Sequence, residues 1–518
     1  MLANSSKVAQ PGRGVWGALI AQCWIIILLI LLRLLFDPFG DSDPGSLIYA
    51  SCLFLVALSI WSLWSWQRLT KSLFDPYVLY FVAAVLFNGG QALLEVFHLN
   101  EGGILDGRFS SETTLETLFL VILGLASFHF GALLAAAASS KIALKQTGKR
   151  IALLPAMQDI RRVGWGLLLI SFVPTLFVLR GAVSIVMSSG YFGLFEATYG
   201  TGFSAGPQVL AGFLVPAALF LLAGSRGRRI GILVSGIVIV SYAVIQFFLG
   251  SRAKAAMPLI AYAWLWHHSI RPLPKTVLLS LGAVMLLIVF PLVGAIRNVS
   301  GEERFSFGFL SDAFLSIDNP TIAIISEMGG SMATVAYTLD LVPSFRDFDK
   351  GVGYLYALLT AIPNLFWDVH PTVARGLPSN WLIWTVNPFI ADLGGGYGFT
   401  FIAEAYFNFG WFGAPIALGV IGFLLGKLTL WAARSGEPAK MAMIAAFLSY
   451  VLFFARQEAA AQVRSLLWYS LVPYLGVYAI ASLRSRSYGK NSDLLNSSGR
   501  PCYSLNSRHE RTPEAQQR

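Results

Sequence analysis

Long apolar stretches alternate with short polar ones along most of this chain. A helix needs roughly 20 apolar residues to cross the hydrocarbon core of a bilayer. By that criterion we expect about twelve spans, and those at 255–270 and 441–455 are short. They lie near residues 16–36, 45–66, 76–97, 115–139, 163–179, 207–225, 230–249, 255–270, 276–296, 401–425, 441–455 and 465–483. The pattern therefore predicts an all-α polytopic integral membrane protein.

Basic residues divide the polar connections into two sets. One set is rich in Lys and Arg and includes both ends of the chain and the connections near 68–71, 141–162, 226–229, 271–275 and 427–440. The other set begins with the acidic DPFGDSDPG and HLNEGGILDG. Because positive charge gathers in cytoplasmic loops, we expect the first set, and hence both termini, in the cytoplasm. Residues 484–518 are polar and basic, which predicts a disordered cytoplasmic tail.

One connection, residues 297–400, is far longer than the others and is predicted to lie outside the cytoplasm. It separates nine predicted spans in residues 1–296 from three in residues 401–483. Structureless loops of this length are uncommon, and this one contains the apolar stretches GYLYALLTAIPNLFWDV and NWLIWTVNPFIADL. We therefore expect short helices at the outer, periplasmic membrane surface, with aromatic residues at the interface.

Composition supports a membrane protein and excludes several other classes. Hydrophobic residues make up 56% of the 518 residues and charged residues only 12%, which would leave a soluble protein with a sticky surface. The net charge of +10 is explained by cytoplasmic loops, so we expect no nucleic-acid partner. The spacing of Cys23, Cys52 and Cys502 fits no disulfide scaffold, metal site or redox pair. The first apolar run is long and lacks a small-residue cleavage site, so we predict a retained helix.

Basic residues on the predicted outer side do not follow the charge rule. A single arginine at an interface usually snorkels or pairs with a nearby carboxylate. Several near the ends of different spans indicate a function, because a guanidinium donates two parallel hydrogen bonds to phosphate. We therefore predict that a bundle brings them together to bind membrane lipids bearing phosphate or pyrophosphate. The set comprises Arg180, Arg252, Lys254, Arg297, Arg304, Arg346, Lys350, Arg375, Arg456 and Arg464.

A carboxylate, Glu404, interrupts the apolar stretch LGGGYGFTFIAEAYFNFGWFG at residues 393–413. If the span begins near Thr400, Glu404 lies about 6 Å below the outer surface, where the helix dipole favours an anion. Asn408 follows one turn later on the same face, between Phe401 and Trp411. Glu404 could cap its helix or pair with an arginine. It could also act as a general base or orient a catalytic arginine.

Two other residues are candidate bases. Asp392 precedes the three glycines, and His370 lies five residues before Arg375. An imidazole is suited to proton transfer, although a single loop histidine is more often structural. We find no GxxxxGK(S/T), HExxH or Cys/His cluster, so no metal or cofactor is expected. The glycines of GGGYG should instead allow a tight turn into the helix at Phe401. A glycosyl donor outside the cytoplasm should be lipid-linked, because nucleotides are not supplied there.

The stretch LGGGYGFTFIAEAYFNFGWFG resembles the signature region of bacterial O-antigen polysaccharide polymerases, the Wzy family. GSRAKAAMPLI, residues 250–260, resembles the arginine segment of the same family. The resemblance implies a membrane glycosyltransferase of the bacterial inner membrane, and a GT-C-like architecture is compatible with it. The growing glycan would move from undecaprenyl pyrophosphate to the non-reducing end of a new lipid-linked repeat unit. A chain-length-regulating co-polymerase and a flippase would be its partners.

The resemblance also implies which residues would stabilise charge, act as a base and bind the substrate. Pyrophosphate is a good leaving group, so no strong general acid is needed. Arginines would stabilise the departing pyrophosphate, and a base would activate the acceptor hydroxyl. Tyr397 and Trp381 would stack on sugar rings or anchor the loop at the interface. The proposed catalytic residues are Arg252, Arg297, Arg456 and Glu404, with His370 and Asp392 as alternative bases. The proposed substrate-binding residues are Arg375, Lys254, Arg464, Asn408 and Tyr397.

Three alternatives remain open on the sequence. An O-antigen ligase shares this plan but transfers polymer to the lipid A core. A flippase or transporter of lipid-linked oligosaccharide would need charges distributed through the bilayer, lining a cavity. Here the charges gather at the predicted outer ends of the spans. A scaffolding partner in the same pathway would leave the arginines simply exposed.

Overall fold

The protein is entirely helical in its regular structure over the residues described by this computed structural model. Those residues are 13–35, 43–143, 155–191, 193–196, 205–297, 306–317, 319–362 and 367–497, with Val299, Gly301 and Asn364. Twelve helices within them are long and apolar enough to cross a membrane. The predicted fold class, an all-α polytopic membrane protein, is confirmed.

Eleven of these twelve helices coincide with predicted spans. They are α1 (Arg13–Leu35), α2 (Pro44–Thr70), α3 (Pro76–Val96), α4 (Ser111–Ala143), α5 (Met157–Ser189), α7 and α8 (Ala205–Ala211, Leu214–Gly224), α9 (Arg229–Phe248), α11 to α12 (Lys275–Val284, Phe290–Ile296), α20 (Phe401–Ser435), α21 (Pro438–Val451), and α22 to α23 (Ala459–Leu466, Val472–Ser497). Helix α23 extends into the predicted tail, whose residues 498–518 lie outside the described part, as does Arg304.

One predicted span is not among the twelve candidate helices, and one candidate helix was not predicted. The stretch predicted at 255–270 forms α10 (Arg252–Ser269), which packs against α9 and α21 but has polar ends that lower its hydropathy. The twelfth candidate, Pro320–Leu341, lies inside the predicted outer loop. It consists of α14 (Pro320–Gly329), a short 3₁₀ turn and α15 (Ala333–Leu341), so its hydrophobic pattern is interrupted.

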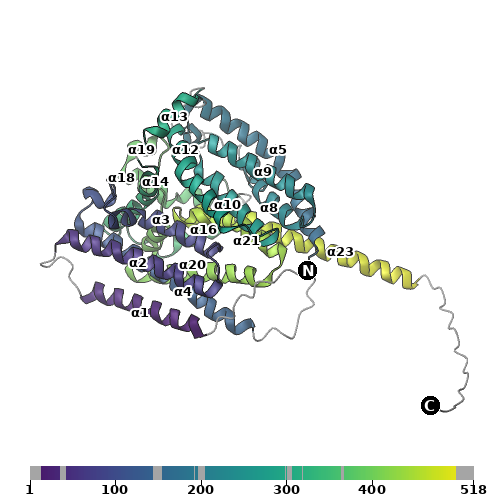
Figure 1. Ribbon diagram of the computed structural model, residues 1–518, viewed down its shortest axis with the longest axis horizontal. Coiled ribbons are helices and arrows are strands. Elements are labelled where there is room, and N and C mark those ends of the chain that lie inside the picture. Colours follow the sequence, from purple (N-terminus) through teal and green to yellow (C-terminus); the bar gives the residue numbers. More distant parts are fainter. Residues whose placement is uncertain are drawn as a thin grey trace, which may run out of the picture.

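Helix α4 is the most deeply buried of the twelve candidate spans and contacts α1, α2, α15 and α20. The backbones of α4 and α20 come very close together at two glycines, one on each helix. A Cβ on Gly131 would fall 1.8 Å from the Gly419 carbonyl oxygen, and one on Gly422 would fall 1.9 Å from that of Phe128. Small residues permit this close approach of membrane helices. By contrast α1 and α5, at opposite edges of Figure 1, expose most of their apolar side chains, as expected for lipid-facing helices.

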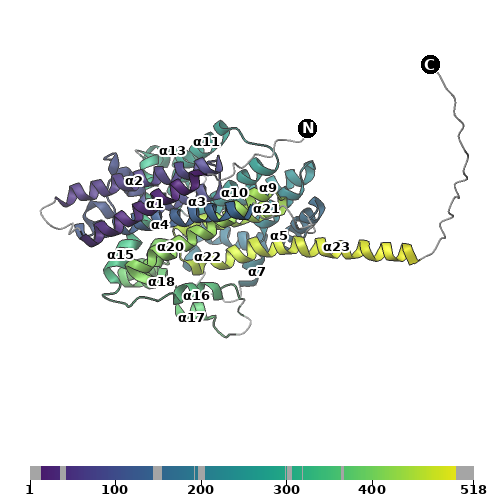
Figure 2. The ribbon, with the colours of Figure 1, turned by 90° about the horizontal axis from the view of Figure 1, so that it is seen from below.

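The long connection contains short helices, as predicted: α13 (Phe307–Leu315), α14, α15, α16 (Val352–Leu359), α17 (Pro371–Arg375), α18 (Pro378–Val386) and α19 (Pro388–Asp392). Proline occupies the first helical position of α14, α17, α18 and α19, where its missing N–H costs no hydrogen bond. Figure 2 shows α16 and α17 beneath the main layer of helices, next to α18.

Helix α20 is broken at Gly410, which has φ +64° and ψ −163°. In an unbroken helix the carbonyls of Phe407 and Asn408 would accept from residues four positions ahead. Here they accept instead from the backbone N–H groups of Asp349 (3.0 Å) and Lys350 (2.8 Å). A Cβ on Gly410 would also lie 3.1 Å from the Phe348 ring. The break therefore attaches the segment before α16 to the middle of α20.

Candidate active site

A cavity of about 730 Å³ lies where α10 begins, α12 ends, and α13 and α14 pass. We call it the arginine cavity. Two of the predicted phosphate-binding residues, Arg252 and Arg297, contribute their side chains to it. Its full lining is Arg252, Pro291, Gly294, Ala295, Arg297, Phe309, Asp312, Ser316, Ile317, Ala323, Ile324 and Glu327.

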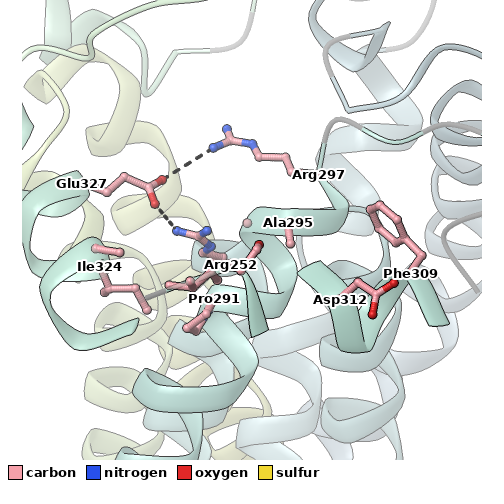
Figure 3. Close-up of a pocket in the computed structure, with 12 residues that line it drawn as sticks. Arg252, Pro291, Ala295, Arg297, Phe309, Asp312, Ile324 and Glu327 are labelled. Atoms are coloured by element: carbon pink, nitrogen blue, oxygen red, sulfur yellow. Dashed lines mark hydrogen bonds and ion pairs between the residues drawn. The ribbon is translucent and has the colours of Figure 1, made fainter. Parts of the chain in front are cut away.

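Glu327 of α14 reaches both guanidinium groups (Figure 3). Its Oε2 accepts a hydrogen bond from Arg252 Nη1 at 2.5 Å, and its Oε1 lies 3.9 Å from Arg297 Nη1. The Glu327 side chain is 47% exposed, whereas that of Arg252 is 20% exposed. Two guanidinium groups that converge on one accessible carboxylate make a site for an anion.

Neighbouring residues hold the two arginines in place. A Cβ on Gly294 would fall 1.9 Å from Arg252 Nη2, so this glycine leaves the room that the guanidinium occupies. The Arg297 guanidinium carbon lies 4.1 Å from the ring centroid of Tyr191, whose N–H donates to the Arg297 carbonyl at 3.3 Å. Stacking on an aromatic face fixes the planar group. Glu327 was not among the predicted site residues, although an ionisable residue in an apolar stretch was a signal for it.

Arg456 does not line the arginine cavity, but the charges of three residues that line it act on its guanidinium group. Burial lowers its pKa, Glu327 opposes that effect, and the charges of Arg297 and Arg252 add to it. The Arg456 carbonyl accepts from the Phe399 N–H at 3.1 Å. Gly398 has φ +77°, and a Cβ there would meet that same carbonyl at 2.8 Å. The GGGYG turn thus holds Arg456 near the other two arginines.

A second cavity of about 250 Å³ lies among α16, α17, α18 and α20, and we call it the loop cavity. Arg346 Nη2 lies 3.8 Å from Asp349 Oδ1, and Arg375 hydrogen-bonds to the same oxygen. Arg375 is therefore in a different cavity from Arg252. The lining is Arg346, Asp349, Gly353, Tyr356, Thr372, Arg375, Gly376, Leu377, Pro378, Asn380, Trp381, Trp384, Phe407 and Ala460.

Glu404 lines neither cavity and is only 1% exposed. Its Oε2 accepts from the N–H of Ala459, the first residue of α22, at 2.8 Å. Glu404 therefore caps α22, whereas Thr400 caps α20 by accepting from the Ala403 N–H at 3.3 Å. Asn408 lies on the same face of α20 and donates to the Glu404 carbonyl at 2.8 Å.

The chain from Arg456 to Ala460 connects the surroundings of the two cavities. Arg456 lies beside the arginine cavity, and Ala460 lines the loop cavity. Four residues of chain keep their Cα atoms within about 14 Å. Glu458, between them, accepts from the Ser379 hydroxyl at 3.0 Å, and burial raises its pKa to about 7. Glu404 and Glu458 thus hold the short segment that joins the surroundings of the two cavities.

The other predicted residues do not line the arginine cavity. His370 caps α17: its Nδ1 accepts from the Thr372 N–H at 3.2 Å, and its Nε2 lies 3.3 Å from the Ile362 carbonyl. Tyr397 receives hydrogen bonds of 3.5 Å from Arg108 and Asn387. Exposed side chains that line neither cavity are Lys254, Asp392 and Arg464.

The described residues contain no group of three or more His, Cys, Asp or Glu side chains able to hold a metal ion. Charge in the arginine cavity comes from its own side chains: two guanidinium groups and the carboxylates of Glu327 and Asp312. The arrangement can hold a ligand anion between the arginines, next to a carboxylate that can accept a proton.

Comparison with known proteins identifies the family of the chain. The family model described as O-antigen polysaccharide polymerase Wzy matches residues 19–486, a range that contains both cavities. No curated protein and no solved structure matches the chain significantly, so a relation to the GT-C architecture stays a prediction. The family match extends over nearly the whole chain, from α1 into α23. The chain therefore belongs to the O-antigen polysaccharide polymerase Wzy family.

Proposed function

We propose that this polymerase holds the diphosphate of an undecaprenyl pyrophosphate-linked glycan in the arginine cavity. Membership of the family makes it a multi-pass bacterial membrane protein that polymerises lipid-linked oligosaccharide repeat units. The convergence of Arg252 and Arg297 on the carboxylate of Glu327 is the observation that carries the finer proposal. An internal carboxylate between two guanidinium groups occupies the place that a phosphate group of the donor would take.

Glu327 can then change its role when the donor binds. Its side chain is exposed enough to turn away from the arginines, which leaves both guanidinium groups for the phosphates. Once turned aside, the carboxylate is free to accept the proton of the acceptor hydroxyl. We therefore favour Glu327 as the general base. The alternative bases are the three predicted from the sequence, Glu404, His370 and Asp392.

The reaction needs one bond to form and one to break. The acceptor hydroxyl oxygen attacks the anomeric carbon of the donor glycan while the bond from that carbon to the diphosphate oxygen breaks. Glu327 takes the hydroxyl proton, and undecaprenyl pyrophosphate departs with the bonding electrons. Arg252, Arg297 and Arg456 stabilise the charge that grows on the leaving group. Because arginines carry out this task, we propose a metal-independent transfer.

We further propose that the arginine cavity opens to the outer face of the cytoplasmic membrane and that both termini are cytoplasmic. The excess of Lys and Arg in alternate connections supports this orientation. The acceptor is the non-reducing end of a new lipid-linked repeat unit. A flippase would deliver that unit, and a chain-length-regulating co-polymerase would act with the polymerase. The family match favours this reaction over ligation to the lipid A core and over transport.

Deleting the gene in its host tests the polymerisation itself. We expect surface polysaccharide on a gel to show a single repeat unit on the lipid core, with the longer ladder absent and restored by the cloned gene. Loss of all repeat units from the core, with long lipid-linked polymer accumulating in the membrane, would identify a ligase instead. An unchanged ladder would contradict the proposal in that pathway.

A pair of variants at Glu404 tests whether this carboxylate positions α22 or acts as the base. Glu404→Gln keeps an oxygen that accepts from the Ala459 N–H, so we expect polymer formation within a few-fold of wild type. Glu404→Ala leaves that buried N–H unpaired at a cost of about 1–3 kcal/mol, so both protein yield and polymer should fall. The ladder and the amount of membrane-inserted protein are measured together. A folded but inactive Gln variant would support Glu404 as the base.

A further inference from the structure

We infer that the loop cavity binds a sugar ring of the acceptor repeat unit. This inference rests on the proposed function, because it assigns the second substrate of the same reaction. Ligand pockets commonly measure about 300–1,000 Å³. At about 250 Å³ the loop cavity suits one or two sugar rings rather than a whole lipid-linked molecule.

Aromatic rings form much of the cavity wall. Trp381 and Trp384 are one helical turn apart on α18 and therefore share a face of that helix. Trp384 is 52% exposed, which leaves its ring available to a ligand. The Arg375 guanidinium carbon lies 4.7 Å from the Tyr356 ring centroid, and that of Arg346 lies 5.0 Å from Trp381. Flat apolar faces beside fixed polar groups match a sugar, whose ring faces are apolar and whose rim carries hydroxyls.

The fixed carboxylate of Asp349 favours a neutral polyhydroxyl ligand over a second diphosphate. Asp349 neutralises part of the charge of Arg346 and Arg375, and its side chain is only 8% exposed. Its N–H donates to the Phe407 carbonyl at 3.0 Å, so the carboxylate is held in the cavity and would repel a dianion. Glu327 in the arginine cavity is exposed and can turn aside. The arginine N–H groups and the Asn380 amide, which both donates and accepts, suit sugar hydroxyls.

The position of the loop cavity also fits an acceptor site. Ala460 lines the loop cavity. Arg456, four residues earlier in the chain, interacts electrostatically with Arg252 and Arg297. A glycan held on Trp384 could therefore extend past this segment and place a hydroxyl of its terminal sugar at the donor carbon. The segment that Glu404 and Glu458 hold would separate the sugar subsite from the diphosphate site.

Competition assays on the full-length protein in lipid vesicles test this inference. Polymerisation of the host's lipid-linked repeat unit is measured with two soluble competitors, namely the repeat-unit oligosaccharide freed from its lipid and inorganic pyrophosphate. For Trp384→Ala we expect half-inhibition to need about tenfold more oligosaccharide, with inhibition by pyrophosphate unchanged. Trp384→Phe, which keeps an aromatic face, should restore most of the oligosaccharide inhibition. Phe389→Ala, an exposed ring on α19 outside both cavities, should alter neither.

The outcomes separate this inference from the proposed function. Unchanged oligosaccharide inhibition in a folded, polymerising Trp384→Ala enzyme would overturn the sugar subsite and leave the polymerase reaction intact. Weaker inhibition by pyrophosphate alone would make the loop cavity a phosphate site and would also overturn it. A wild-type protein that forms no polymer from the lipid-linked unit would instead count against the proposed function. Thermal melting of each variant identifies misfolding. If Trp384→Ala is misfolded, oligosaccharide inhibition of the Trp384→Phe enzyme shows whether the loop cavity binds the sugar.

Discussion

Replacing Arg252 by lysine should reduce polymer formation about a hundredfold or more, the usual effect of removing one donor that stabilises a transition-state anion. Lysine keeps the positive charge but loses the planar fork that donates two parallel hydrogen bonds to phosphate. Arg252 is mostly buried, and its Nη1 already points at the carboxylate of Glu327. Gly294 leaves space for the guanidinium, which an ammonium on a flexible chain would not fill. The expected result is a ladder reduced to one or a few repeat units.

The measurement is the length distribution of surface polysaccharide in a deletion strain that expresses each variant at matched membrane levels. Arg180→Lys is the control, because Arg180 is an exposed arginine of α5 that lines neither cavity. Its ladder should equal that of wild type. A full-length ladder from the Arg252→Lys protein would remove Arg252 from the diphosphate site.

Replacing Glu327 by glutamine should have two opposite effects. The rate of polymerisation should fall about a hundredfold, because general acid–base groups contribute at least that much. Inorganic pyrophosphate should inhibit more strongly, because the neutral amide no longer competes with phosphate for Arg252 and Arg297. A purely structural role for Glu327 would not weaken turnover while strengthening the binding of an anion.

The comparison uses the vesicle assay, with rate and pyrophosphate inhibition measured on one preparation of each variant. Glu112→Gln is the matched control, since Glu112 is an exposed carboxylate of α4 that lines neither cavity. Asp392→Asn is measured beside it, because Asp392 was itself predicted as a base. A normal rate from the Glu327→Gln enzyme would exclude Glu327 as the base. A loss of rate from Asp392→Asn would transfer that role to Asp392.

The sequence by itself determined the membrane fold and most of the spans. A membrane helix satisfies its own backbone hydrogen bonds, so length and hydropathy are enough to identify one. Arg252 and Arg297 sit at the ends of neighbouring predicted spans, so their approach followed from the connectivity. The interrupted stretch at 320–341 was missed because a 3₁₀ turn divides it into two short helices.

Only the tertiary structure decided which polar groups meet. Arg375 was grouped with Arg252 by charge, yet it pairs with Asp349 in a separate cavity. The roles left open for Glu404 included a cap on its own helix and an arginine partner, yet it accepts from the N–H of Ala459, 55 residues away. The break at Gly410 frees the carbonyls that bind residues 349 and 350. Such partners lie far apart in the chain, and each buried polar group takes whichever donor or acceptor the packing brings within reach, so local sequence patterns do not specify them.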